Sequence, residues 1–534
     1  MKKILIIAIS LGIFVLPSCE SFLEEDLVSD VSASSYYVTE QGFEDAVNAT
    51  YTPLRDYYAR EMGASLTVFG TDTYKNGADG SHKGINQYDS RLNAQESYFR
   101  DFWRSFYAAI NQANAVIRRA DEIEGLSEDL KTLRIAEVRF LRALYYFELV
   151  RTYGDIHLTL DETLGVETEA ARTPASEIYS QAIIPDLEFA IANLPVTQED
   201  YGRTTEPAAK HLLSKVLLTR GYTDFAASDD FSRSAELAES VINDYDFALL
   251  DDFTAVFDQS AQLHDEVIWS VQYTQDPLIN GPGNEMHLYF LMVYDVQPGM
   301  TRDIENGRPW RRFWPTDFLL GLWDKEADVR FDGSFKRVFY ANNPATLPEG
   351  VNIGDTAIYL PGEEVSQEFR DSKPYMIITP SEYTEQLFPS LSKFLDPNRP
   401  DRQYQNGSRD WMVMRLAETH LIAAEAYFQA GNSEAAAEHL NVVRRRAAKE
   451  GMEAAMEITA ADVNIDYILD ERARELVGEM HRFFDLTRTG KLVERVRAHN
   501  PQASANIQDF HVLRPIPQDQ IDRTEGEFRQ NEGY

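Results

Sequence analysis

Two tryptophans lie close together in a segment rich in glycine and proline. Trp310 and Trp314 flank an Arg-Arg-Phe run in "ENGRPWRRFWP". An exposed indole offers a flat apolar face that can stack on a sugar ring or an apolar side chain, and its N–H can fix the orientation of the bound group. An aromatic residue in such a loop can also serve as an anchor for the core. We therefore treat both tryptophans as candidate ligand-binding residues, with the core role left open.

The sequence carries no recognisable catalytic motif. It has no G-x-S-x-G elbow, Walker loop, H-E-x-x-H or EF-hand loop, and its histidines are scattered. With 87 acidic residues, the carboxylate pairs that a glycoside hydrolase uses arise by chance throughout the chain. His420 and Glu425 are expected to pack rather than to bind a metal. These observations predict a protein that is not an enzyme and that uses neither a cofactor nor a metal ion.

Alternating charges are dense in "ILDERARELVGEMHRFFDLTRTGKL". The charged residues that could form a site there are Arg472, Glu475, Glu479, Arg482 and Asp485. At three- and four-residue spacing such groups more often form ion pairs. We therefore expect them to fix this helix on its neighbours.

The chain has a single cysteine, Cys19, which follows a short apolar run at the N-terminus. Two lysines precede the run, residues 4–16, and the run is too short to span a bilayer, so it reads as a secretory signal. Leu16-Pro17-Ser18-Cys19 resembles a bacterial lipobox, although Pro17 departs from the usual small residue. We expect residues 1–18 to be a lipoprotein signal peptide and the Cys19 thiol to carry the lipid that anchors the protein. The alternative is a buried free thiol.

Composition excludes several classes of protein. The 534 residues include 87 acidic and 51 basic residues, and the resulting net charge of -36 disfavours a nucleic-acid partner. Hydrophobic residues make up 43% and aromatic residues 12%, which is typical of a folded globular chain. A lone cysteine excludes an internal disulfide and a thiolate metal site.

Apolar residues recur at helical spacing in both halves of the chain. Helices are expected at 41–58, 98–122, 132–153, 176–193, 208–222 and 232–243, with Gly154 placed to end the third. Residues 411–447 have the small residues and tight turn of a tetratricopeptide pair, in which Gly431 ends the first helix and Ser433 can cap the second. Such a pair cannot bury its apolar face alone, so we expect it to stack on the earlier helices.

The composition changes between residues 246 and 410, where Pro, Gly and Asn become frequent and the helical periodicity of apolar residues weakens. Short alternating runs such as "VIWSVQY" suggest a few strands there. The predicted divisions are a signal peptide (1–18), a lipidated tether (19–40), an N-terminal helical half (41–245), a loop-rich region expected to bind ligand (246–410) and a C-terminal helical half (411–534).

Six segments resemble, in order, motifs of the SusD/RagB family of nutrient-uptake outer-membrane lipoproteins. They are "FWRSFYAAINQANAVI", "EVRFLRALYYFELVRTYGDIHL", "PTDFLLGLWDKEADVRFDGSF", "MRLAETHLIAAEAYFQAG", "ERARELVGEMHRFFDLTRTG" and "LRPIPQDQID". His157 stands where the family usually has proline, and the start "CESFLEEDLVSD" lacks its usual proline. One such motif is weak evidence for a family, but here six occur in the order of the family's motifs, along nearly the whole chain.

The resemblance implies a mainly α fold, a SusD-like α-α superhelix built on tetratricopeptide-like pairs, with a loop-rich region that contains a few short strands. It implies capture of a glycan at the cell surface, or of a peptide in RagB-like relatives, and delivery to a SusC-like TonB-dependent barrel in the outer membrane. The ligand-binding loops of the family share no motif, so the candidates come from this sequence alone. They are Trp310 and Trp314, with Tyr74 and Asp72 from "FGTDTYKNGADG".

Two other functions remain open. A surface glycoside hydrolase would release product, and an assembly protein would use its helical repeats to bind other proteins. The acids after the cysteine also have two interpretations, as a signal for export to the outer leaflet or as a solvated linker: Glu20, Glu24, Glu25 and Asp26.

Overall fold

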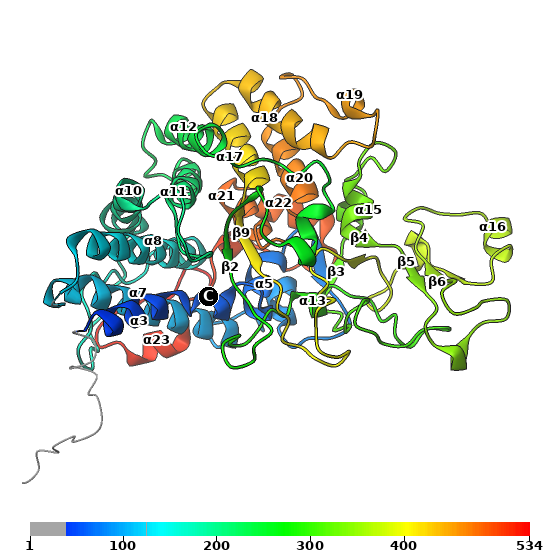
Figure 1. The fold of residues 1–534 in the computed structure, drawn as a ribbon, viewed down its shortest axis with the longest axis horizontal. Helices are drawn as coiled ribbons and strands as arrows, with labels where there is room; N and C mark the ends of the chain where they lie inside the picture. Colours follow the sequence, from blue (N-terminus) through cyan, green and yellow to red (C-terminus); the bar gives the residue numbers. More distant parts are fainter. Residues whose placement is uncertain (1–38, 124) are drawn as a thin grey trace, which may run out of the picture.

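The computed structural model describes residues 39–123 and 125–534 (Figure 1). The predicted lipid-bearing Cys19, the signal peptide and nearly all of the tether lie outside the described residues. The described chain is mainly helical, with a few short strands, as predicted. Among its helices, none combines the length and apolar character needed to cross a membrane.

The long helices pack side by side in one row, which climbs from α3 to α18 in Figure 1. In order, the row contains α3 (Glu40–Tyr51), α7 (Ser97–Arg119), α8 (Glu128–Tyr153), α10 (Ile184–Asn193), α11 (Glu206–Arg220), α12 (Asp230–Asn243), α17 (Leu416–Gln429) and α18 (Ser433–Arg446). Because α12 packs directly on α17, the N-terminal and C-terminal helices form a single stack. The prediction that the tetratricopeptide-like pair stacks on the earlier helices is confirmed.

Local signals explain where these helices begin and end. The Ser127 side chain accepts a hydrogen bond from Leu130 N at the start of α8, and Gly154, at φ +74°, ends it as predicted. The helix expected at 41–58 is instead two, α3 and α4 (Leu54–Tyr57), because Pro53 has no N–H to continue the helical ladder.

The tetratricopeptide-like pair differs from expectation at two points. Trp411–Arg415 forms a strand, β9, and the helix begins only at Leu416. Gly431 ends this helix in a left-handed conformation, as predicted. Asn432, not Ser433, caps the second helix, because its side chain accepts a hydrogen bond from Ala435 N at 3.1 Å while Ser433 is already helical.

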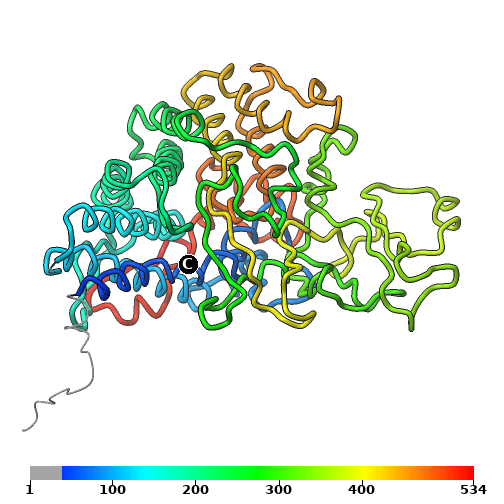
Figure 2. Tube along the Cα trace, viewed as in Figure 1, coloured from blue at the N-terminus to red at the C-terminus, as the bar shows by residue number. Residues whose placement is uncertain are grey.

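The middle of the chain contains short strands whose partners are distant in sequence, and its far lobe extends away from the helical stack (Figure 2). The pairs are β1 (Tyr74–Asn76) with β3 (Phe313–Pro315), β2 (Val267–Val271) with β9, β4 (Phe335–Lys336) with β8 (Ser390–Leu391), and β6 (Thr356–Tyr359) with both β5 (Val338–Tyr340) and β7 (Met376–Ile377). Strand β2 confirms the strand expected in "VIWSVQY".

The remaining helices are short connectors around this region and the C-terminal half. They are α5 (Glu61–Val68), α6 (Lys83–Gln87), α9 (Ala175–Ile178), α13 (Met286–Tyr289), α14 (Asp317–Leu320), α15 (Arg330–Ser334), α16 (Gln367–Asp371), α19 (Glu453–Met456), α20 (Ile465–Glu475), α21 (Arg482–Arg488), α22 (Leu492–His499) and α23 (Gln518–Arg523).

A buried arginine ties the middle region to helix α20. The Arg330 side chain has no solvent exposure, and its guanidinium lies 2.7 Å from Asp328, 2.6 Å from Glu471 and 3.1 Å from Glu475. A charge in this position is stable only while each of its partners stays in place. Arg330 therefore fixes α15 on α20.

A second arginine continues the same buried network. Arg415, at the end of β9, lies 2.9 Å from Glu266 and 2.7 Å from Glu475. It also lies 2.7 Å from Glu479, whose carboxylate is 2.8 Å from Lys393 Nζ. Strand β9, the segment before β2 and the middle region thus meet at one row of carboxylates.

The charged segment 468–492 is structural, as expected, but it is not one helix. It breaks after α20 at Glu475 and resumes as α21 at Arg482, with Met480 at φ +65° in the turn. Arg472 lies 2.8 Å from Asp485 across this break. Most of the segment's ion pairs thus join separate elements rather than neighbours along one helix.

We expect the Arg330→Met protein to lose about 3–5 kcal/mol of unfolding free energy, because the substitution leaves buried carboxylates without their partner. Arg445→Ala is the control, since Arg445 pairs with Glu457 at the surface and both side chains are more than 40% exposed. Such a surface pair contributes below about 1 kcal/mol. Urea unfolding of residues 20–534 measures both, and equal stability of the two variants would contradict the role of Arg330.

Stability is also expected to depend on pH in a defined window. Burial would raise the pKa of Glu471, but Arg330, Arg474 and Arg444 outweigh it and lower that pKa from 4.5 to about 2. The folded state then binds fewer protons than the unfolded chain, so this carboxylate stabilises the fold above pH 4.5 and loses that effect as the pH falls towards 2. The urea midpoint should fall across this window, and less steeply in Arg330→Met. A flat profile in the unsubstituted protein would refute the expectation.

Candidate functional site

The two segments that carry the candidate ligand residues meet in one small sheet. Strand β1 pairs antiparallel with β3, and Lys75 stands directly opposite Trp314. Side chains alternate along a strand, so Lys75 and Trp314 share one face while Tyr74 and Phe313 belong to the other. The Lys75 Nζ lies 3.6 Å from the centroid of the Trp314 ring, within cation–π range. Burial lowers the pKa of Lys75, with Asp317 opposing the shift.

Trp310 rests on a different part of the core. Its ring centroid lies 5.9 Å from that of Tyr289 and 5.0 Å from the Arg312 guanidinium carbon. Trp314 packs instead on the smaller cluster that contains Tyr294 and Phe339. Both indoles are partly exposed. Each tryptophan therefore packs on a core cluster and stays partly exposed, and contact of either with a ligand stays a prediction.

Residues 77–82 form a loop that lies directly against the tryptophan segment. Gly77 N donates a hydrogen bond to Arg312 O at 2.9 Å, and a Cβ at Gly77 would lie 2.2 Å from Arg311 O. Arg311 itself has φ +46°, which is uncommon for a residue with a side chain. Its guanidinium Nε lies 3.1 Å from a carboxylate oxygen of Asp79. A glycine at position 77 is thus required for the close seating of this loop.

Groups that donate and accept hydrogen bonds lie around Arg312, whose guanidinium contacts Trp310. The Arg312 Nε lies 2.7 Å from Glu61, and burial raises the pKa of Glu61 while Arg312 opposes the rise. His82 stacks on Tyr98 with ring centroids 3.5 Å apart, and its Nδ1 lies 2.7 Å from Glu96. Flat apolar faces beside fixed carboxylates, guanidiniums and a phenol are the groups that recognise a ring carrying several hydroxyls.

The structure turns Tyr74 and Asp72 inward. Tyr74 is 1% exposed and packs its ring on Phe290 and Phe313. Asp72 has no exposure and accepts hydrogen bonds at 2.7 Å from Arg482 and from Arg495. Burial would raise the pKa of Asp72, but the two arginines outweigh it and lower it. Both residues support the strand that carries Lys75, and a direct ligand contact by either stays a prediction.

Several polar groups of this surface were not singled out from the sequence. Lys75 could have been found from the alternation of side chains along a strand, because it is next to the candidate Tyr74 and faces the opposite side. Arg312 lies between the two tryptophans and could have been included with them. Glu61 begins α5 and Tyr98 lies in the first turn of α7, and neither has a local signal that predicts its place near Arg312.

We expect Gly77→Ala to destabilise the protein by roughly 1–3 kcal/mol, because the added Cβ would strike the Arg311 backbone. The fluorescence of the partly exposed tryptophans should change as the loop moves. Gly165→Ala is the matched control, since a Cβ at Gly165 meets nothing within 4 Å. If both variants kept the unfolding midpoint and emission of the unsubstituted protein, the seating of the loop would not depend on this contact.

Comparison with known proteins supports the fold and its family. Residues 265–534 match the model of the SusD family, and residues 22–218 match a family described as starch-binding associating with outer membrane. A SusD-like protein of Formosa agariphila is 25% identical over 530 residues, which cover 95% of this chain and 94% of the relative. The starch-binding protein SusD of Bacteroides thetaiotaomicron is 24% identical over 456 residues, which cover 78% of this chain and 75% of SusD.

Solved structures show the same architecture. A laminarin binding SusD-like protein has a TM-score of 0.69 and 23% identity, and the match covers 93% of this chain and 100% of that one. A SusD homolog from Bacteroides thetaiotaomicron has a TM-score of 0.75 and 19% identity over 95% of this chain and 99% of its own. The chain belongs to the SusD family, as its six motifs predicted.

Proposed function

We propose that this protein captures an oligosaccharide at the cell surface and delivers it to a TonB-dependent, SusC-like barrel in the outer membrane. One observation carries the proposal. Trp310 and Trp314, from a single short segment, present partly exposed indoles beside fixed hydrogen-bonding groups. Sugar rings have apolar faces and hydroxyl edges, and this surface offers a match to both.

The acids beside the tryptophan segment are each held by a guanidinium. A glycoside hydrolase needs one carboxyl group that gives up a proton and a second that acts as base or nucleophile. Here Glu61 lies 2.7 Å from Arg312, and Asp79 is engaged by Arg311. The Asp79 carboxylate is thus suited to accept hydrogen bonds from hydroxyls, whereas burial raises the pKa of Glu61, so release of sugar is the measurement that separates capture from hydrolysis. The names of two relatives, starch-binding and laminarin binding, agree with a carbohydrate ligand.

We place the protein at the outer membrane, anchored by lipid on Cys19 and facing the cell exterior. The lipobox-like sequence and the family description, starch-binding associating with outer membrane, support this location. The barrel partner follows from the resemblance to the SusD/RagB family. A tether of this kind raises the effective concentration of binding protein at the barrel, so each site needs only modest affinity.

Affinity gels that contain single polysaccharides test the proposal on soluble residues 20–534. One polysaccharide should retard the protein, and no sugar should be released from it. Trp310→Ala and Trp314→Ala should each weaken retention about tenfold or more, as truncation of a contacting tryptophan does. Tyr201→Ala is the control, because Tyr201 is a 42% exposed aromatic in the N-terminal half, outside the loop-rich region expected to bind ligand.

Three results would change the proposal. Released sugar would establish hydrolysis instead of capture. Retention that survives both tryptophan substitutions would move the binding surface elsewhere. If no polysaccharide retards the protein, binding of peptides to the same residues 20–534 becomes the measurement that decides, and a bound peptide would make this a RagB-like uptake protein.

A further inference from the structure

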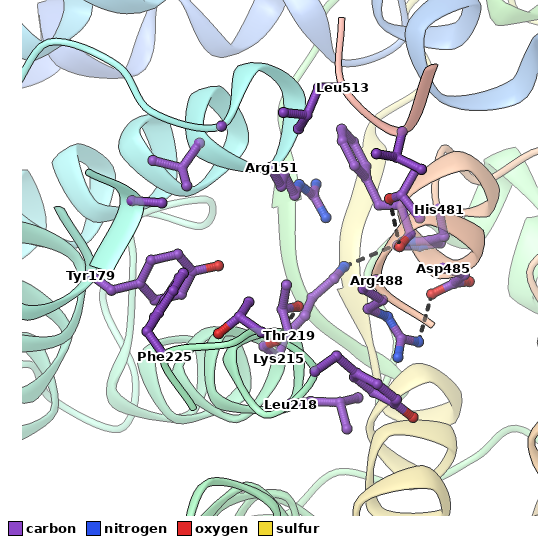
Figure 3. Close-up of a pocket in the computed structure, with 18 of the residues that line it drawn as sticks. Arg151, Tyr179, Lys215, Leu218, Thr219, Phe225, His481, Asp485, Arg488 and Leu513 are labelled. Carbon is purple, nitrogen blue, oxygen red and sulfur yellow. Dashed lines mark hydrogen bonds and ion pairs between the residues drawn. The ribbon is translucent and has the colours of Figure 1, made fainter. Parts of the chain in front are cut away.

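A cavity lies within the helical body (Figure 3). It has a volume of about 250 Å³ and is formed where the end of α8, helices α11 and α21 and the segment 512–513 converge. Pockets for drug-sized ligands are typically about 300–1,000 Å³, so this one suits a smaller molecule, near the size of one sugar or aromatic ring. None of the residues of the tryptophan surface lines it.

One end of the cavity is aromatic. Tyr179 and Phe225 lie together there in Figure 3, with their ring centroids 5.5 Å apart. Phe484 also lines the cavity, at its other end, where the Arg151 guanidinium carbon lies 3.7 Å from the centroid of its ring. These side chains offer flat faces to a planar or ring-shaped body. A wholly apolar cavity of this size would favour a hydrocarbon ligand. The opposite end of this cavity is charged.

The opposite end presents cations. The lining contains Arg151, Lys215, Arg472 and Arg488, against the single acid Asp485. Their other carboxylate partners do not line the cavity. They are Glu148 for Arg151, Glu418 for Lys215 and Arg472, and Glu425 for Arg488. The surface that faces the cavity is therefore more positive than the whole cluster.

Arg472 places a buried charge at this end of the cavity. Its side chain is 2% exposed, and its Nε lies 2.8 Å from Asp485. Its Nη1 is buried without a hydrogen-bond partner among the described residues. Because Nη1 is also closed off from solvent, Arg472 acts on an anion in the cavity through its charge rather than through this N–H.

Lys215 is buried beside a carboxylate and an imidazole. Its Nζ lies 2.8 Å from Glu418 and 3.3 Å from His481 Nδ1. Burial lowers the pKa of Lys215, and Glu418 opposes that shift only in part. Burial also lowers the pKa of His481 to about 3, so the imidazole is neutral at pH 7 and adds no charge to this end. An anion placed in the cavity would meet an ammonium whose charge the folded protein leaves incompletely balanced.

We propose that this cavity binds a small organic acid, whose ring lies against the aromatic end and whose carboxylate lies at the charged end, where it accepts a hydrogen bond from Lys215. The ring can be that of a sugar acid or of an aromatic acid, since both supply a flat body and one carboxylate. The site is independent of the proposed glycan surface. A bound acid would join α8 and α11 of the N-terminal half to α20 and α21 of the C-terminal half.

Calorimetric titration of residues 20–534 tests the proposal with two acids and their neutral counterparts. The pairs are sodium benzoate with benzyl alcohol and sodium D-glucuronate with D-glucose. At least one acid should bind saturably with one site per chain and raise the thermal unfolding midpoint, while its neutral counterpart should do neither. Binding of benzoate alone would assign an aromatic acid, and binding of glucuronate alone a sugar acid.

Three substitutions locate the binding. Lys215→Gln should weaken it about tenfold or more, because a charge-assisted hydrogen bond is lost. Ala175→Trp should abolish it by filling the cavity from its partly exposed rim. Lys210→Gln should leave it unchanged, because Lys210 is on the same helix but pairs with Glu206 outside the cavity.

Two results would overturn the proposal. One is the absence of saturable binding by either acid to the unsubstituted protein. The other is binding that Ala175→Trp does not reduce, and this variant decides the matter even if Lys215→Gln fails to fold. Retention on polysaccharide gels should be the same for all three variants, so failure here leaves the glycan proposal standing.

Discussion

Buried ion pairs hold the distant parts of this chain together. Glu471, Glu475 and Glu479 are spaced four residues apart from α20 into the turn that follows it, and all three are buried. They receive cations from three other regions, with Arg330 from the middle region, Arg415 from β9 and Arg446 from α18. Removing these charges from water is costly, and the cost is recovered only when every partner is present. The network can therefore form only when the middle region and the C-terminal helices assemble together.

Buried ion pairs also support the candidate site. Asp72 is held by Arg482 of α21 and Arg495 of α22, and strand β1 begins two residues later at Tyr74. The strand places Lys75 opposite Trp314, so a buried carboxylate ultimately fixes where this indole lies. A surface aromatic held in this way loses little freedom when it stacks on a ligand, which favours binding without any new contact.

The sequence predicted the helical scaffold well because apolar periodicity, capping residues and terminal glycines are local signals. The end of α8 at Gly154 and the turn at Gly431 are examples. It predicted less of the site. An aspartate beside aromatic residues in a loop has the same local appearance whether it faces a ligand or the core. For Asp72 the answer depends on arginines that lie 410 and 423 residues away. Glu61 is likewise brought to Arg312 only by the tertiary fold.

Strands β2 and β9 pair so that Val271 stands opposite Trp411. The chain thus leaves the helical scaffold and returns to it at adjacent points. Residues 272–410 form an excursion, a long inserted segment whose two ends are held together by the β2–β9 pair. Such a segment can change in length and content at little entropic cost to the scaffold, because the strand pair already fixes the distance between its ends. Arg330 and Lys393 fasten the excursion to the helices. Within the excursion, the lobe that carries β5, β6 and β7 has a core cluster of its own. A chain that kept Arg330, Lys393 and the β2–β9 pair could therefore exchange this lobe for another, so that new specificity would be acquired by replacement rather than by redesign.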